Sequence, residues 1–153
     1  MPNNGTIIKV SGPLVVAKGL SGTCIYDMVR VGNYKLFGEV VEIRGEEYFI
    51  QVYEETEGLG PGEPVYPTYS AFSVELGPGL IGAIYDGIQR PLDVINRLHG
   101  DYIVRGIEHP PLDRMKKWHF HPVKHVGDDV IPGDVIGYVQ ESKLVRHQIM
   151  VPV

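Results

Sequence analysis

The first half of the chain is a series of short apolar runs separated by glycine, proline and charged residues. Residues 6–10 and 14–18 are two such runs, and Ser11-Gly12-Pro13 divides them. Because short apolar runs bounded by turn residues are typical of β-strands, a strand, a turn and a second strand are predicted here. A third strand is predicted over residues 25–31. Its two faces carry Ile25, Val29 and Val31 on one side and Tyr26 and Met28 on the other.

A β-hairpin is predicted where two longer runs, residues 36–44 and 48–53, flank a turn at Gly45. Both faces of the second run are partly apolar, since Tyr48, Ile50 and Val52 alternate with Phe49, Gln51 and Tyr53. Strands that are apolar on both faces favour a small closed barrel over an open sheet. Two further short strands are predicted over residues 65–69 and 72–76.

One helix is predicted over residues 91–99. Pro91 suits the first helical position because its missing N–H is not needed there, and Asp93 in the first turn favours the helix dipole. The apolar stripe consists of Leu92, Ile95 and Leu98. Gly100 is a suitable residue to end the helix. Since it spans only about two turns, we expect a connector and not a member of a helical bundle.

The second half has a short internal echo in VGDDVIPGDVIGYV, residues 126–139. Gly127-Asp128 and Gly133-Asp134 are each followed by apolar residues, which predicts two turns of the same kind between short strands. A further strand is predicted over residues 145–151, whereas the prolines and charges of residues 109–118 indicate a linker.

Together these patterns predict a mainly all-β fold. A β-barrel is expected over residues 1–76, and a Gly/Pro-rich connector with the short helix over residues 77–111. An incomplete second β unit is expected over residues 112–153.

Composition narrows the class of protein. With 153 residues, 43% hydrophobic and 22% charged, the chain can form one ordinary soluble domain or two small ones. No apolar run reaches the roughly 18–20 residues needed to span a bilayer, and the N-terminus lacks the pattern of a secretory signal. Cys24 is the single cysteine, so no intramolecular disulfide is possible. The net charge of −5 argues against nucleic acid as a partner.

The stretch GPGLIG, residues 77–82, matches the dinucleotide-binding pattern G-x-G-x-x-G, and Asp101 lies about twenty residues downstream. A dinucleotide loop follows a buried strand and opens a long helix. Here Glu75 places a charge in the preceding run, Pro78 removes a backbone donor, and Pro91 prevents a long helix. We therefore interpret the glycines as permitting sharp bends and close backbone approach at a domain boundary.

Two groups of residues in the sequence are candidate metal sites, but each has a simpler interpretation. The carboxylates of Glu54, Glu55 and Glu57 are interpreted as a solvated acidic loop, since nothing in the sequence fixes their geometry for a cation. His119, His121 and His125 form H-x-H-x-x-x-H, and imidazoles are good zinc ligands. Paired surface histidines are the preferred interpretation, so no metal site and no cofactor is predicted for this chain.

A carrier function is a further alternative. The echo in residues 126–139 resembles the V-x-x-G-D-x-V-x-x-G-D-x-I pattern of biotinyl and lipoyl carrier modules, which are flattened β-barrels. A carrier needs a modifiable lysine at a hairpin tip. Lys116 is the nearest candidate, but it precedes the predicted strands.

A longer comparison of motifs indicates a family. VELGPGLIGAIYDGIQRPLD, residues 74–93, closely resembles the sequence after the N-terminal barrel in the catalytic A subunit of V-type and archaeal A-type rotary ATPases. SGPLVVAKGLSGTCIYDMVRVG and GEVVEIRGEEYFIQVYEETEGLGPGEPV, residues 11–32 and 38–65, resemble its barrel. DRMKKWHFHP and RHQIMVP resemble its bulge insertion, which the B subunit lacks. The resemblance covers nearly the whole chain, in order.

The resemblance implies a six-stranded N-terminal barrel followed by the start of a bulge domain. A nucleotide-binding domain with ATP and Mg²⁺ and a helical domain come later in the parent subunit. Three A and three B subunits alternate in an A3B3 ring. The implied role is a scaffold that holds this ring of an ion-transporting ATPase or ATP synthase. The ring is cytoplasmic and peripheral to the membrane, without direct insertion.

The chemistry of that family does not map onto this chain. A P-loop needs G-x-x-x-x-G-K-[ST], and the chain contains no Gly-Lys pair. We therefore expect no catalytic residue and no ATP hydrolysis by this chain, which by itself would be a monomer or a weak oligomer. The structural or interface candidates are Gly77, Gly79, Gly82, Arg90 and Trp118.

Overall fold

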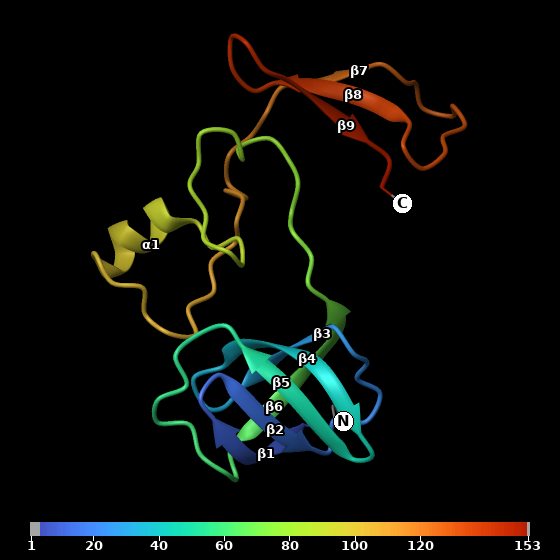
Figure 1. Cartoon of the computed structure of the whole chain (residues 1–153). Helices are drawn as coiled ribbons and strands as arrows, with labels where there is room; N and C mark the ends of the chain where they lie inside the picture. Colours follow the sequence, from blue (N-terminus) through green and yellow to red (C-terminus); the bar gives the residue numbers. More distant parts are fainter. Residues whose placement is uncertain (1–3, 153) are drawn as a thin grey trace. The chain divides into compact units, whose positions relative to one another are not determined.

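The structure, a computed structural model, describes residues 4–152. Six strands come first: β1 (Gly5–Ser11), β2 (Leu14–Lys18), β3 (Asp27–Val31), β4 (Leu36–Arg44), β5 (Glu47–Val52) and β6 (Pro64–Ala71). The helix α1 (Leu92–His99) follows, and then β7 (Phe120–Pro122), β8 (Val135–Gln140) and β9 (Arg146–Met150). The predicted fold class, mainly β with a six-stranded barrel, one short helix and a partial second β unit, is confirmed (Figure 1).

The first six strands close into a barrel in the order β1-β2-β5-β4-β3-β6. All neighbouring strands are antiparallel, and β1 closes the barrel by pairing with β6 through Gly5 and Val65. The register of β4 against β5 shifts between Val40 and Glu42. Such bulges bend a strand and increase its twist, which helps a small sheet to close.

The barrel core comes from the inward-facing positions of all six strands and from Leu20. Its members are aliphatic and buried: Ile7, Val15, Ala17, Leu20, Val29, Val31, Leu36, Val40, Ile50, Val52 and Val65. These are the positions that period-two alternation assigns to one face of each strand. The alternation of apolar with other residues along each strand therefore places aliphatic side chains inside the barrel.

Two strand predictions in the barrel need correction. The third strand begins at Asp27 and not at residue 25, because Tyr26 has a left-handed φ of 74° inside a turn closed by the Asp27 N–H and the Cys24 carbonyl. Of the two strands predicted over residues 65–69 and 72–76, the first is present within β6, which ends at Ala71, whereas residues 72–76 form no strand. Beyond it, the Glu75 N–H donates to Gln89 Oε1 at 2.7 Å, and its carbonyl accepts from Gln89 Nε2 at 2.7 Å. The Gln89 side chain thus makes the hydrogen bonds to Glu75 that a neighbouring strand would otherwise make.

The predicted helix is present, shifted by one residue at its start. Pro91 lies at the N-cap with φ −73° and ψ 108°, and is not the first helical residue. Ile95 is buried, whereas Leu98 is 61% exposed, so the apolar stripe is covered only in part. Gly100 ends the helix with φ 79°, and its N–H donates to the Asn96 carbonyl.

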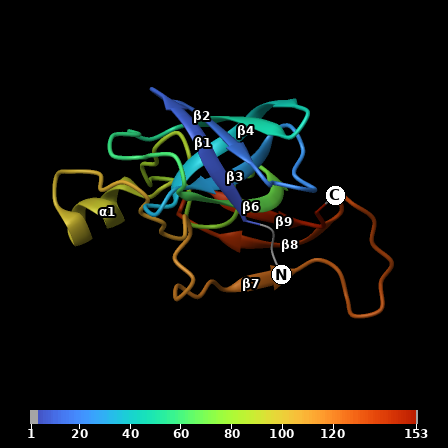
Figure 2. The same cartoon turned by 90° about the horizontal axis from the view of Figure 1, so that it is seen from below.

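The remaining strands form a three-stranded antiparallel sheet in the order β7-β8-β9 (Figure 2). Strand β7 was not predicted, because its three residues, FHP, carry no alternation. The echo before β8 consists of two similar turns, in which His125 and Ile131 donate their N–H groups to Asp128 Oδ2 and Asp134 Oδ2 at 2.8 and 3.2 Å. No strand lies between these turns in the described part of the chain.

The chain forms two compact units. The first contains the barrel, up to Ser73, and the later segment Tyr102–Ile107. The second contains Val74–Asp101 and the residues from Glu108 onward. Within residues 4–152, no helix is long and apolar enough to cross a bilayer.

Candidate functional site

The glycine-rich loop, residues 77–82, lies in the second unit and consists of turns that are not followed by a helix. A Cβ on Gly77 would lie 2.9 Å from Leu112 Cδ1, and one on Gly79 would lie 3.6 Å from Trp118 Cζ2. Gly79 and Gly82 have left-handed φ angles of 109° and 87°. Gly77 therefore allows the close approach of Leu112, whereas Gly79 and Gly82 supply left-handed backbone angles, since a Cβ 3.6 Å from Trp118 would make an ordinary contact.

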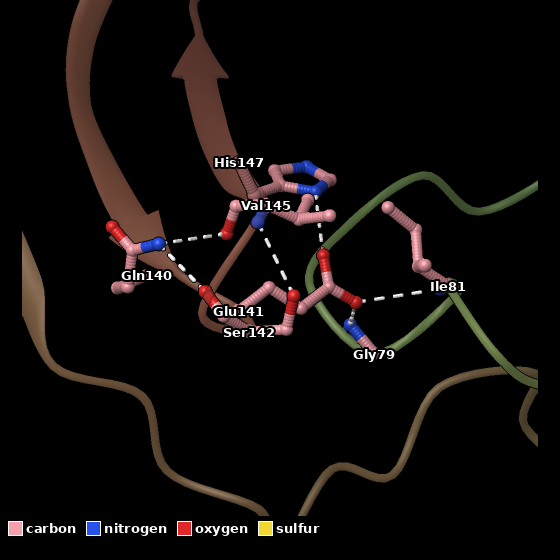
Figure 3. Close-up of polar contacts among 7 residues, drawn as sticks. All are labelled: Gly79, Ile81, Gln140, Glu141, Ser142, Val145 and His147. Atoms are coloured by element: carbon pink, nitrogen blue, oxygen red, sulfur yellow. Dashed lines mark hydrogen bonds and ion pairs between the residues drawn. The ribbon is translucent and has the colours of Figure 1, made fainter.

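The N–H groups of this loop already have an anionic partner. Glu141, in the turn between β8 and β9, accepts the Gly79 N–H at 2.7 Å and the Ile81 N–H at 3.3 Å on Oε1 (Figure 3). Its other oxygen, Oε2, lies 3.2 Å from His147 Nδ1. The Glu141 side chain is only 5% exposed. The loop is thus bound by the chain's own carboxylate at the amides where a dinucleotide loop would hold a phosphate.

Arg90 is buried and paired within its own loop. Its Nε lies 2.6 Å from Asp86 Oδ2, and its N–H donates to Asp86 Oδ1 at 2.8 Å. The Asp86 carboxylate thus bonds both the guanidinium and the backbone N–H of Arg90, and both side chains are largely shielded from water, which strengthens these charge-assisted bonds. Arg90 therefore holds the bend that precedes α1.

Trp118 lines an open pocket of about 530 Å³ in the second unit, together with Pro78, Tyr85, Arg97 and Leu112. The Lys116 ammonium lies 4.0 Å from the centre of the Trp118 ring. The Tyr85 hydroxyl donates to the Pro111 carbonyl at 2.9 Å. Burial, followed by the nearby charges of Asp93 and Glu141, raises the pKa of Tyr85, so its hydroxyl keeps its proton to a higher pH than that of an ordinary tyrosine.

The histidines do not converge into a metal site. His119 and His121 have ring centres 4.5 Å apart, and His121 stacks on Tyr138 at 4.8 Å. The His125 side chain is 92% exposed and lies 3.7 Å from Asp128. Across residues 4–152, no group of three or more His, Cys, Asp or Glu side chains is arranged to hold a metal ion.

The interpretation of residues 54–57 as a solvated acidic loop is wrong for Glu54. Its side chain accepts the N–H groups of Phe37 and Gly106, each at 3.0 Å. Glu55 and Glu57 do have exposed side chains. The Glu54 carboxylate therefore has a structural role, because it binds backbone N–H groups of two other segments.

Sequence reasoning did not predict the contacts of Glu141, His147 and Glu54. Glu141 contacts Gly79, 62 residues away, and Glu54 contacts Gly106, 52 residues away, so no local spacing indicates these bonds. His147 lies within six residues of Glu141, but their contact depends on the turn between β8 and β9. Lys116, the carrier candidate, precedes β7, as the sequence indicated, whereas Lys143 lies in the loop between β8 and β9.

Comparison with known proteins identifies the class. Residues 7–69 match a family model described as the ATP synthase alpha/beta family, beta-barrel domain. Residues 109–153 match one described as the ATPsynthase alpha/beta subunit barrel-sandwich domain. These two ranges coincide with the closed barrel and with the region that carries β7, β8 and β9. The chain belongs to the ATP synthase alpha/beta family.

Individual relatives place the chain within that family. It is 59% identical over 148 residues to the V-type ATP synthase alpha chain of Clostridium botulinum. It is 56% identical over the same length to the A subunit of the A-type ATP synthase of Thermococcus kodakarensis. Each match covers 97% of this chain and 25% of the relative, so the chain spans about a quarter of the length of the relatives that it matches. Nearly the whole chain is thus similar to one part of these V-type and A-type proteins.

Proposed function

We propose that this chain is the scaffold and assembly region of the A subunit of an ion-translocating V/A-type ATP synthase or ATPase. The identity of 59% over 97% of the chain to a V-type alpha chain carries this proposal. The closed barrel supports it, because a barrel leaves no free sheet edge and makes a rigid module for assembly.

The partners and cofactors belong to the parent subunit, by which we mean a longer protein that contains this chain. B subunits of an A3B3 ring are its proposed partners, and ATP and Mg²⁺ bind in its nucleotide domain. The parent complex is cytoplasmic and peripheral to the membrane. This assignment fits the chain, which has no Gly-Lys pair for a phosphate loop.

The three-part division of the chain enters this proposal with one change, since the segment Tyr102–Ile107 belongs to the barrel unit. We assign the range 1–76 to the crown barrel, 77–111 to the connector, and 112–153 to an incomplete bulge insertion. The described contacts support structural roles for Gly77 and Arg90, and the left-handed φ angles support backbone roles for Gly79 and Gly82. Trp118 is the proposed interface residue, since it lines an open pocket and tryptophan is frequent at interface hot spots.

Two measurements test the proposal. Reading the source gene beyond codon 153 should give an open frame that reaches G-x-x-x-x-G-K-[ST], and a stop codon at that point would contradict a parent subunit. Titration of the chain with Mg-ATP in a calorimeter should give no saturable heat. Tight, saturable binding would show that this chain has a nucleotide site of its own, which would contradict a purely structural role.

A second candidate function is that of a biotinyl or lipoyl carrier, and one observation favours it. Lys143 is exposed in the short loop between β8 and β9, the hairpin position that a carrier lysine requires. Its amine would attack the carbonyl of a biotinyl or lipoyl adenylate, forming an amide and releasing AMP and a proton.

Intact mass measurement tests this candidate. The chain is expressed in cells that contain biotin and lipoate ligases and are supplied with both acids. A carrier gains an adduct that Lys143→Arg abolishes and Lys116→Arg keeps. An unmodified mass under these conditions excludes the carrier function.

A further inference from the structure

Two parts of the first unit that are far apart in the sequence are bonded to each other. One is the acidic loop, residues 54–57, which follows β5. The other is the strap, Tyr102–Ile107, which returns to the barrel unit after the excursion of residues 74–101. Their hydrogen bonds join residues 48 to 52 positions apart.

Glu54 is the central group of this contact. One carboxylate oxygen, Oε2, accepts the Phe37 N–H of β4 at 3.0 Å. The other, Oε1, accepts the Gly106 N–H of the strap at 3.0 Å. Because hydrogen bonds to an ionised carboxylate are roughly twice as strong as neutral ones, Glu54 ties the strap directly to a barrel strand.

Arg105 supplies the reciprocal contacts. Its Nη1 donates to the Glu55 carbonyl at 3.2 Å and to the Glu57 carbonyl at 2.6 Å. Its guanidinium also lies 5.0 Å from the centre of the Tyr34 ring, within the range of a cation–π contact. Each segment therefore contributes a charged side chain that satisfies backbone groups of the other.

Gly106 makes the fit close. A Cβ at this position would lie 1.9 Å from the Tyr34 carbonyl oxygen, and the residue has a left-handed φ of 70°. A Cβ essentially never lies under 3.0 Å from another heavy atom. Only glycine allows the strap to approach the barrel here.

We propose that the acidic loop and the strap form a clamp, held shut by Glu54, which fixes the C-terminal end of the excursion 74–101 to the barrel, while β6 holds its N-terminal end. The barrel unit is then discontinuous, and it includes residues well beyond position 69, where the matched barrel family model ends. A segment held at both ends has less freedom than one attached at a single hinge. The use of this clamp, to keep the barrel firmly tied while other parts of the parent protein move, rests on the proposed scaffold function.

The first test is amide hydrogen exchange by NMR on the whole chain, comparing Glu54→Gln with Glu57→Gln. A glutamine at position 54 keeps one acceptor oxygen and turns an NH₂ group toward the other N–H. We expect exchange of the Gly106 or Phe37 amide to accelerate by at least about tenfold, the size expected for a lost bond to a charged group. Glu57→Gln makes the same charge change at an exposed side chain, and should leave both amides unchanged.

The second test separates close packing from backbone strain. Gly106→Ala and Gly100→Ala both place alanine at a left-handed φ, 70° and 79°, but only position 106 has a neighbour within 4 Å. We expect Gly106→Ala to expose the amides of the strap while the β4–β5 ladder stays protected, and Gly100→Ala to leave the strap unchanged.

Three results would overturn the clamp: unchanged strap exchange in both Glu54→Gln and Gly106→Ala, equal effects of Glu54→Gln and Glu57→Gln, or loss of protection throughout the barrel together with the strap. The exchange experiment needs no partner subunit. Failure of ring assembly would therefore contradict the scaffold function and leave the clamp standing.

Discussion

At the scale of single residues, Glu54 and Glu141 have the same role in the two units. Each carboxylate accepts N–H bonds from two residues that are distant in sequence. A backbone N–H left without a partner away from water costs free energy comparable to a lost hydrogen bond. These two side chains therefore stabilise loop conformations that no regular secondary structure would support.

Glu141→Ala should destabilise the second unit. The substitution leaves the Gly79 and Ile81 N–H groups and His147 without their acceptor, which should lower the free energy of unfolding by about 1.5–3 kcal/mol. Urea denaturation followed by fluorescence of Trp118, the chain's single tryptophan, measures this change. Asp129→Ala, at an exposed position, should stay within about 0.5 kcal/mol of the unchanged chain. Equal unfolding curves for the two variants would show that the Glu141 contacts contribute nothing.

Tyr53 should titrate far from its ordinary range. Its hydroxyl donates to Glu39 Oε2, and this hydrogen bond, followed by burial and the charge of Glu39, raises the pKa from 10.0 to about 12. Because the raised pKa belongs to the folded state, the stability that Tyr53 contributes is complete below pH 10.0 and lost as pH rises toward about 12.

Ultraviolet titration of tyrosinate measures this pKa. The difference between the unchanged chain and Tyr53→Phe should show a midpoint near 12, and Glu39→Gln should move that midpoint down toward 10.0. A Tyr53 midpoint that Glu39→Gln leaves unchanged would mean that the hydrogen bond is not its cause.

At the scale of elements, alternation and turn residues were enough to predict the barrel strands. The hairpin of β4 and β5 was predicted within one residue, because two apolar-rich runs flank a turn marked by Gly45. The strand predictions failed at two places. At Tyr26 a left-handed backbone angle interrupts the extended chain. At Glu75 the Gln89 side chain makes the hydrogen bonds that a neighbouring strand would make. In the site, the bends at the glycines could be predicted. The carboxylate that fills the loop could not, because its contacts depend on tertiary structure.

The two turns before β8 should be sensitive to their glycines. Gly127 and Gly133 have φ angles of 101° and 91°, and no other atom lies within 4 Å of where a Cβ would stand. Alanine at either position should therefore cost only the backbone strain, about 1 kcal/mol. Gly87→Ala is the matched control, since Gly87 has open space but no left-handed φ. Urea unfolding followed by Trp118 fluorescence compares the three variants, and equal destabilisation by Gly87→Ala would contradict the role of the turns.

At the scale of the whole molecule, the chain passes between its two units three times, after Ser73, Asp101 and Ile107. The sequence indicated a barrel followed by a connector, but not the return of residues 102–107 to the barrel. That return depends on Glu54 and Gly106, which are 52 positions apart. A fragment that ends at residue 101 should therefore lack part of the barrel unit.

The isolated chain should be a monomer or a weak oligomer, since in the proposed ring each barrel contacts B subunits instead of copies of itself. Sedimentation equilibrium at low micromolar concentration should give a mass near 17.0 kDa. A stable dimer or trimer at that concentration would contradict alternating contacts.

The most direct test of the scaffold role is native mass spectrometry of the parent subunit co-expressed with its B subunit. The intact parent is compared with a variant that lacks residues 5–71, the six barrel strands, and Mg-ATP binding is measured for both. We predict A3B3 rings for the intact parent, and for the variant unchanged Mg-ATP binding with no rings. Rings of equal yield without the barrel would show that this chain does not hold the ring together.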